Sequence, residues 1–235
     1  MNHKESSMQK PSAWITATAM RATMAVRARL AEDSWHEAQQ RGVRQYVILG
    51  AGLDTYAYRA PLAPDTRVFE VDLPAMTQWK RECLRAADIP EPLSVSYVST
   101  DLTTGALSED LQQAGFDPAL PACFCWLGVS IYLKPDQVML TLRDIADCAP
   151  GSSIVFDYCV HRRHLSEQEC AGLDFVAGTL AAQGEHLHSS FEPPLLQHML
   201  HHHGYRHIED FDASALQTLY GAPLSGIFRL MRATV

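Results

Sequence analysis

The sequence lacks several features that would place it in a specialised class of proteins. No apolar run approaches the roughly 20 residues that a membrane-spanning helix needs, and the polar first dozen residues hold no apolar stretch typical of a secretion signal. Positive charge is scarce: 19 lysines and arginines stand against 27 acidic residues, and a formal charge of −8 argues against nucleic acid as the main partner. The absence of a Gly-Lys-Ser/Thr motif excludes a P-loop.

What is present indicates an ordinary globular protein. The chain has 235 residues, 47% of them hydrophobic, which suffices for one domain with a well-buried core. The six cysteines have no regular spacing and lie in hydrophobic surroundings, which predicts buried free thiols and a reducing compartment. We therefore expect a single cytoplasmic domain over residues 1–235, without a membrane or nucleic-acid partner.

Strand-like and helix-like segments alternate along most of the chain. Short apolar runs typical of buried strands occur at 45–49, 68–71, 93–98, 122–127 and 153–156. Helical spacing occurs at 76–87 and 135–148 between strands, and later at 165–183 and 194–203. Two closely spaced strands are predicted at 205–211 and 226–231. The pattern predicts an α/β fold, a doubly wound sheet that ends in an antiparallel pair.

The first predicted strand runs into a glycine turn, Gly50-Ala51-Gly52, where backbone N–H groups can approach a ligand closely. Glu70 and Asp72 end the next strand, where an acidic side chain can accept hydrogen bonds from ribose hydroxyls. A dinucleotide site would want a third glycine near Thr55, and its absence disfavours a nicotinamide oxidoreductase. An adenosine ligand without phosphates, S-adenosylmethionine, fits better. The bland alternative is that the glycines merely permit a tight turn.

Two stretches carry a family resemblance: RGVRQYVILGAGLDTYAYR at 41–59 and VFEVDLP at 68–74. They resemble the leucine carboxyl methyltransferase family, in particular its bacterial branch that includes polyketide O-methyltransferases. Shorter matches are STDL at 99–102, WLGVSIYL at 126–133 and SFEP at 190–193. The resemblance implies a Rossmann-like class I methyltransferase with a seven-stranded, mostly parallel sheet, an antiparallel C-terminal strand and helices on both faces.

The resemblance also implies a set of cofactor residues. Arg27 would bind the methionine carboxylate, with Arg29 as a competing candidate. Gly50 and Gly52 would line the cofactor turn. Asp72 would hold the ribose hydroxyls, with Glu70 in reserve because alternate residues of a strand point the same way.

The remaining implied residues lie at the adenine and at the acceptor. Asp101 and Leu102 would flank the adenine, although Asp101 has an alternative reading as a helix cap. Tyr132 matches a substrate-contacting tyrosine and would orient the acceptor as a hydrogen-bond donor; Tyr158 is a weaker candidate of the same kind.

The chain departs from the family pattern near the acceptor. Leu127 stands where some relatives carry a glutamate, and Thr103 stands where eukaryotic members place an arginine for the substrate carboxylate. The region before Arg27 is short, so either the pocket is more open or a second subunit, as in a homodimer, completes it. We divide the chain into a flexible 1–12, a short helical lid at 13–40, a cofactor core at 41–160 and substrate-side elements at 161–235.

Taken together, the sequence predicts an S-adenosylmethionine-dependent O-methyltransferase. The expected acceptor is a small-molecule carboxylate, phenol or hydroxyl, polyketide-like and part of secondary metabolism. A protein that binds the cofactor without catalysis is the alternative. His186 or His188 would be the general base for a hydroxyl acceptor. We predict no metal site, although His198 and His202 have i, i+4 spacing.

Overall fold

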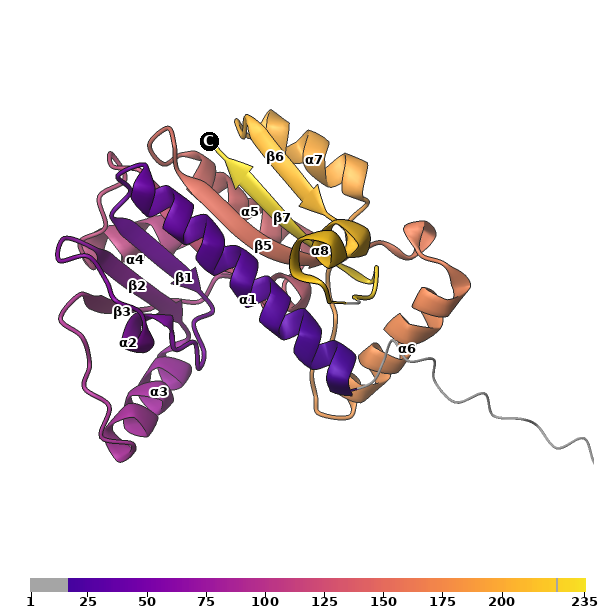
Figure 1. Cartoon of the computed structure of the whole chain (residues 1–235), viewed down its shortest axis with the longest axis horizontal. Coiled ribbons are helices and arrows are strands. Elements are labelled where there is room, and N and C mark those ends of the chain that lie inside the picture. Colours follow the sequence, from indigo (N-terminus) through magenta and orange to yellow (C-terminus); the bar gives the residue numbers. More distant parts are fainter. Residues whose placement is uncertain (1–16, 223) are drawn as a thin grey trace, which may run out of the picture.

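Seven strands form one sheet in the order β3-β2-β1-β4-β5-β7-β6 (Figure 1). The computed structural model describes residues 17–222 and 224–235. The strands are β1 (Gln45–Leu49), β2 (Arg67–Asp72), β3 (Val95–Ser99), β4 (Ala122–Trp126), β5 (Ser153–Cys159), β6 (His207–Phe211) and β7 (Phe228–Thr234). Strands β1 to β5 pair in parallel, whereas β7 runs antiparallel to both β5 and β6. The predicted seven-stranded, mostly parallel sheet with an antiparallel C-terminal strand is confirmed.

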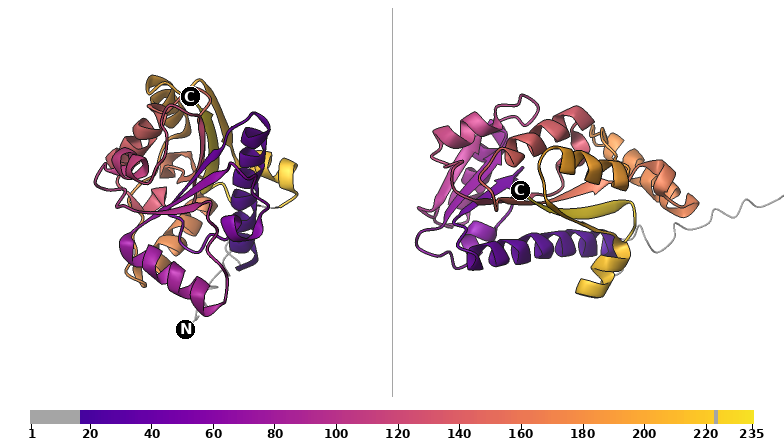
Figure 2. Two further views of the ribbon diagram at one scale, coloured as in Figure 1. Left: turned by 90° about the vertical axis from the view of Figure 1, so that its left-hand side faces the viewer. Right: turned by 90° about the horizontal axis from the view of Figure 1, so that it is seen from above.

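Helices cover both faces of this sheet (Figure 2). They are α1 (Ala17–Gln40), α2 (Tyr56–Arg59), α3 (Pro74–Ala86), α4 (Leu107–Gln113), α5 (Pro135–Ala146), α6 (Glu167–Ala181), α7 (Pro193–His202) and α8 (Ala213–Tyr220), with short 3₁₀ turns η2 (Ser130–Tyr132) and η3 (Arg162–His164). Four of them, α3, α5, α6 and α7, match the helices predicted from the spacing of apolar residues. None of the described helices is long and apolar enough to cross a membrane.

Helix α8 was missed by the sequence prediction, which placed two strands in close succession. Its boundaries carry ordinary signals. The Asp212 side chain accepts a hydrogen bond from the Ala215 N–H (2.9 Å) at the start. Gly221 ends the helix in the left-handed conformation, with φ 69°. The helix returns the chain from edge strand β6 to β7, which is inserted between β5 and β6.

Alternation along the strands builds two separate cores. Val47 and Leu49 belong to the core under α4, α5 and α7, whereas Tyr46 and Ile48 belong to the core that includes α1 and Leu216 of α8. This division follows from the period of two along a strand. Both faces of β1, β4 and β5 are buried, which explains their nearly continuous apolar sequences.

Helix α1 belongs to the core along much of its length. Trp35 is fully buried and stacks on Tyr46 with ring centroids 4.7 Å apart. The opposite half of the helix carries Arg27 to the carboxyl edge of the sheet. Of the region predicted as a lid, 13–40, the structure describes 17–40 as α1, whose second half is anchored in the core; residues 13–16 and the predicted flexible residues 1–12 lie outside the described part.

All six cysteines are free, as predicted, but only three of them are buried. Cys123 and Cys125 lie in the middle strand β4 and Cys159 ends β5. Burial raises the pKa of Cys123 to about 12. Such thiols are protonated at neutral pH and act as small apolar side chains.

Candidate cofactor site

The glycine turn after β1 is fastened to the end of β2. Gly50 and Ala51 both donate their backbone N–H to the Val71 carbonyl, at 2.8 and 3.0 Å. Gly50 has φ +66°, and a Cβ there would collide with the Val129 side chain. Glycine is therefore required at this position for two independent reasons, backbone conformation and close packing.

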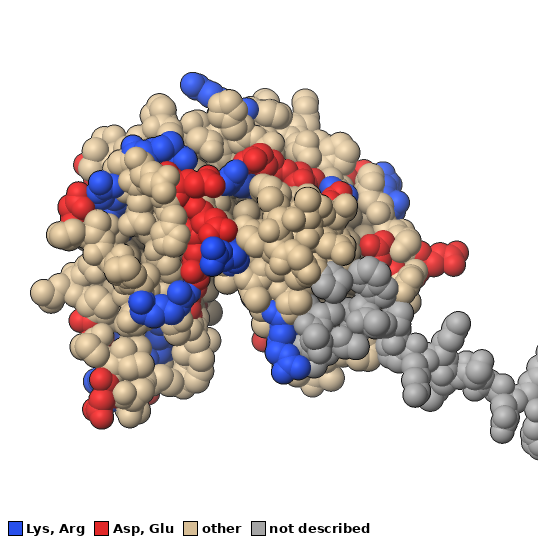
Figure 3. All heavy atoms as spheres, viewed as in Figure 1, with Lys and Arg blue, Asp and Glu red and all other residues tan. Residues whose placement is uncertain are grey.

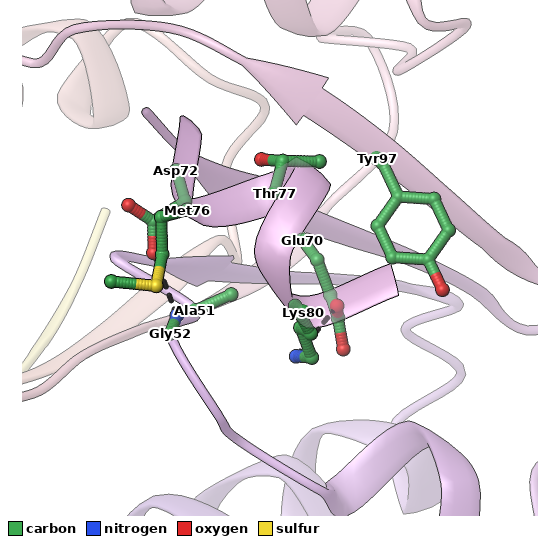
Figure 4. Close-up of a pocket in the computed structure, with 8 residues that line it drawn as sticks. All are labelled: Ala51, Gly52, Glu70, Asp72, Met76, Thr77, Lys80 and Tyr97. Atoms are coloured by element: carbon green, nitrogen blue, oxygen red, sulfur yellow. Dashed lines mark hydrogen bonds and ion pairs between the residues drawn. The ribbon is translucent and has the colours of Figure 1, made fainter. Parts of the chain in front are cut away.

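Gly52 has open space where a side chain would stand. Its φ is +41°, and the nearest atom to a Cβ built there is the Gly50 carbonyl at 3.9 Å. Its N–H donates to Asp72 Oδ2 at 2.6 Å. A shallow depression lies beside this turn (Figure 4), lined by Ala51, Gly52, Glu70, Asp72, Met76, Thr77, Lys80 and Tyr97. The turn thus leaves room for a ligand group next to Asp72.

The two acidic residues of β2 have different surroundings. Asp72 is half-buried at the strand end, and its Oδ1 also accepts from the Leu73 N–H at 2.7 Å. Carboxylate oxygens have two lone pairs each, so Asp72 keeps acceptor capacity for hydroxyls. Glu70 is 2% exposed and is engaged by Lys80 Nζ at 2.7 Å and the Tyr58 hydroxyl at 3.0 Å. Burial raises the pKa of Glu70, and Lys80 partly offsets this.

The predicted adenine residues follow β3. The Thr100 N–H donates to the Asp72 carbonyl at 2.9 Å, which places this segment beside the end of β2. Asp101 is exposed, and its Oδ1 accepts from the Thr103 N–H at 2.9 Å. Since α4 begins only at Leu107, Asp101 closes a turn and caps no helix. Leu102 is half-buried against the core.

On the other side of β1, an ion pair lies across the end of β4. Arg27 Nη1 is 2.9 Å from Asp157 Oδ2, and Asp157 Oδ1 accepts from the Gly128 N–H at 2.7 Å. The Asp157 side chain is 8% exposed; its burial raises the pKa of the carboxyl, and the charge of Arg27 opposes that rise. Arg29, by contrast, is 68% exposed and pairs with Asp33 along the helix surface. The structure therefore brings Arg27, and not Arg29, to the sheet edge.

Asp157 was missed by the sequence analysis. The available signal was a single carboxylate in the apolar run SIVFDYC, near the carboxyl end of a strand that is buried along its whole length. A buried acid in such a place needs a partner. The partner, Arg27, is 130 positions away in the chain, so no local pattern shows it.

Tyr132 lies in η2, beyond the end of β4. It packs against a small apolar cluster made by Ile131, Cys159 and Ile227, together with Leu173, Leu187 and Phe228. Burial and the neighbouring carboxylate of Glu185 raise the pKa of Tyr132 to about 12. The opposing charges of Arg27 and Asp157 also act on the phenol, with Arg27 lowering its pKa. Tyr132 is therefore a protonated donor at neutral pH.

Tyr158 has another environment. It is fully buried on the opposite face of β5, where its hydroxyl donates to Asp210 at 3.0 Å. This tyrosine points into the core on the face of β5 away from Asp157, which speaks against its weaker candidacy as an orienting residue. Successive side chains of a strand point to opposite faces, so Asp157 and Tyr158 were bound to separate.

The histidines stay near the surface. His186 and His188 are exposed, and the His188 backbone donates to the Ile131 carbonyl at 2.8 Å, close to Tyr132. His198 and His202 are exposed on α7. Within residues 17–222 and 224–235, no three metal-binding side chains come together.

The candidate residues follow one another along the carboxyl edge of the sheet. Asp101 follows β3, Asp72 ends β2, Gly52 follows β1, and Arg27 lies over the loop after β4. Figure 3 shows a notch at the lower edge of this face, beside the lobe with α3, with charged side chains of both signs at its head. Ligands of open α/β sheets bind at such a switch in strand order, here between β1 and β4.

Strand order, glycine turn and acidic strand end together define a Rossmann-like methyltransferase of class I. The leucine carboxyl methyltransferase model matches residues 1–146. YktD of Bacillus subtilis, assigned as an S-adenosyl-L-methionine-dependent methyltransferase, is 33% identical over 208 residues, 86% of this chain and 68% of that protein. The chain belongs to the leucine carboxyl methyltransferase family, whose cofactor is S-adenosylmethionine.

Two further similarities set the extent of the match. A Parafrankia protein assigned to the same activity is 37% identical over 142 residues, 60% of this chain and 46% of its own length. A crystal structure of a protein from Thermobifida fusca, assigned as a methyltransferase, superposes with a TM-score of 0.64 at 20% identity, covering 93% of this chain and 83% of that one. The chain thus spans 68% of the Bacillus protein and 46% of the Parafrankia protein in sequence. The solved structure supports the fold.

Proposed function

We propose that this protein transfers a methyl group from S-adenosylmethionine to an oxygen of a small molecule, a carboxylate or a phenol, in secondary metabolism and with a polyketide-like acceptor. The observation that carries the oxygen assignment is Tyr132, a protonated hydroxyl that faces Glu185 and packs against an apolar cluster, with the charges of Arg27 and Asp157 also acting on it. A donor in that position favours an oxygen acceptor, because an oxygen can accept the hydrogen bond with one lone pair and attack with another, whereas an amine nitrogen has a single lone pair.

The residues along the sheet edge follow the order of the cofactor's parts, from the adenine through the ribose to the amino-acid end. Asp101 would accept from the adenine amino group, Asp72 from the ribose hydroxyls, and Arg27 would pair with the α-carboxylate. Gly52 supports the fit, since its missing side chain leaves open space beside Asp72. When bound, the cofactor supplies a methyl group on a positively charged sulfur.

Tyr132 and its apolar neighbours would act on the acceptor. The hydroxyl donates to the acceptor oxygen and orients it, while Ile131, Ile227 and Phe228 keep water away. A carboxylate is already ionised at neutral pH and needs no base. A phenol would need one, and His188 is the histidine whose backbone is bonded beside Tyr132.

The test is turnover with a panel of small carboxylic acids and phenols, followed by mass spectrometry of S-adenosylhomocysteine and of the methylated product. Mild alkali then separates the two oxygen classes, because it hydrolyses a methyl ester and leaves an aryl ether intact. Products methylated only on nitrogen or carbon would overturn the proposal. Cofactor binding without turnover of any acceptor would favour a non-catalytic, cofactor-binding protein.

A further inference from the structure

Asp157 is the one carboxylate of β5, and it joins three separate parts of the molecule. Its Oδ2 binds Arg27 of α1, and its Oδ1 accepts from the backbone of Gly128 after β4. Its own carbonyl accepts from the Ser130 hydroxyl at 2.5 Å, at the start of η2. The residue thus fastens the loop that leads to Tyr132 as well as the arginine above it.

Gly128 completes the seat of Arg27. It has φ +72°, and a Cβ built there would lie 2.8 Å from Nη2 and 2.9 Å from Nη1 of Arg27. The guanidinium therefore lies against the backbone of this glycine, held by Asp157 on one side. An arginine side chain has many rotamers, and its free end loses conformational entropy when a ligand fixes it. A seat of this kind removes part of that freedom before a ligand arrives.

The two side chains of the ion pair differ in how deeply they are buried. The Arg27 side chain is 26% exposed while the Asp157 side chain is 8% exposed. The Asp157 carboxylate is enclosed, whereas the Arg27 guanidinium keeps a solvent-facing surface. A bound carboxylate would therefore meet the arginine first, and the acid would act through it.

We propose that Asp157 is a positioning residue that fixes the Arg27 guanidinium over Gly128 for the α-carboxylate at the amino-acid end of the cofactor. This inference rests on the proposed function, because it presumes that the cofactor's amino-acid end lies at Arg27. It assigns no direct contact between Asp157 and the ligand.

The test is calorimetry on Asp157→Asn with two ligands. The substitution keeps an acceptor for the Gly128 N–H and removes the charge that holds Arg27. We expect the Kd for S-adenosylhomocysteine to rise about tenfold, and the Kd for methylthioadenosine, which lacks the amino-acid end, to stay unchanged. Asp210→Asn is the matched control, since Asp210 is an equally buried partner of an arginine, Arg229, and should leave both affinities unchanged.

A double-mutant cycle separates positioning from direct binding. In an Arg27→Met background, Asp157→Asn should not weaken S-adenosylhomocysteine binding further. A tenfold loss in that background, an unchanged affinity of the single variant, or an equal loss for both ligands would each overturn the inference. If the wild type binds neither ligand, it is the proposed function that fails.

A second variant covers the case in which Asp157→Asn does not fold. Gly128→Ala keeps the Asp157 carboxylate, and its added Cβ would lie 2.8 Å from Nη2 of Arg27, so the guanidinium must shift. It should weaken S-adenosylhomocysteine and spare methylthioadenosine, with thermal unfolding confirming a folded variant. Equal affinity of this variant and the wild type for S-adenosylhomocysteine would contradict the seat described above.

Discussion

Two buried aspartates of this protein each pair with an arginine, and the two pairs lie on opposite faces of the sheet, near β5. Asp157 and Arg27 lie on the α1 face of β5, 2.9 Å apart, and Asp210 and Arg229 lie on the α7 face, 3.0 Å apart. Their side-chain exposures are almost equal, 8% and 26% against 6% and 28%. Distance and burial therefore do not distinguish the pair proposed for the cofactor from the structural pair.

The remaining partners do distinguish them. Among the described residues, the donors to the Asp210 carboxylate are side chains, the Tyr158 hydroxyl at 3.0 Å and the Gln197 amide at 3.2 Å besides its arginine. Asp157 accepts instead from the backbone of the loop after β4. Asp72 repeats this pattern, because its two donors are backbone N–H groups at the glycine turn. Asp72 and Asp157 thus accept hydrogen bonds from loop backbone at the carboxyl edge of the sheet, whereas Asp210 joins side chains of separate elements.

Asp210→Ala should have the largest effect and tests whether the Asp210–Arg229 pair is purely structural. It would leave Arg229, Tyr158 and Gln197 without their shared acceptor, and we expect a loss of about 3 kcal/mol in the free energy of unfolding. Affinity for S-adenosylhomocysteine should not change. Denaturant unfolding and calorimetry measure the two quantities; a large fall in affinity would place this pair in the cofactor site after all.

Arg27→Ala should produce the next largest effect, this time on binding. We expect the Kd for S-adenosylhomocysteine to rise about 30-fold, or about 2 kcal/mol, because a charge-assisted contact with the α-carboxylate is lost. Arg29→Ala on the same helix is the control, since Arg29 is exposed and pairs with Asp33. If the two variants bind equally well, the assignment of the cation is wrong.

Asp72→Ala should weaken cofactor binding by at least tenfold, about 1.4 kcal/mol. The reason is the loss of the ribose acceptor together with the bond to the Gly52 N–H. Asp65→Ala is a suitable control, because Asp65 is exposed and pairs only with Arg44 among the described residues. If calorimetry gives Asp72→Ala the cofactor affinity of the wild type, Asp72 does not bind the cofactor and its likeness to Asp157 has no functional meaning.

The smallest effect is expected from Tyr132→Phe, a reduction of a few-fold in kcat with a chosen acceptor. Since burial and Glu185 raise the pKa of Tyr132 to about 12, the hydroxyl stays protonated below that pH and is a donor throughout. The ratio of wild-type to variant kcat should therefore be constant between about pH 6 and pH 9. A ratio that rises with pH would indicate that the phenolate, acting as a base, takes part.

Much of the fold could be predicted because the decisive patterns are local. The run QYVIL before Gly50 has the continuous apolar character of a strand buried on both faces, and β1 is one. Helix α8 escaped prediction although Asp212 and Gly221 bound it, because eight residues between two strands of an antiparallel pair resemble a connection. Tertiary packing through Leu216 makes this segment part of the core.

The sequence by itself determined the glycine turn, the acidic end of β2 and the family, because these depend on residues that are close together in the chain. Only the tertiary structure decided that Asp72 accepts from the glycine turn while Glu70 is engaged by Lys80, although both point to the same side of β2. It also brings Arg27, rather than Arg29, to the sheet edge and pairs it with Asp157. These choices depend on which helix covers which strand, and a contact across 130 positions leaves no trace in local periodicity.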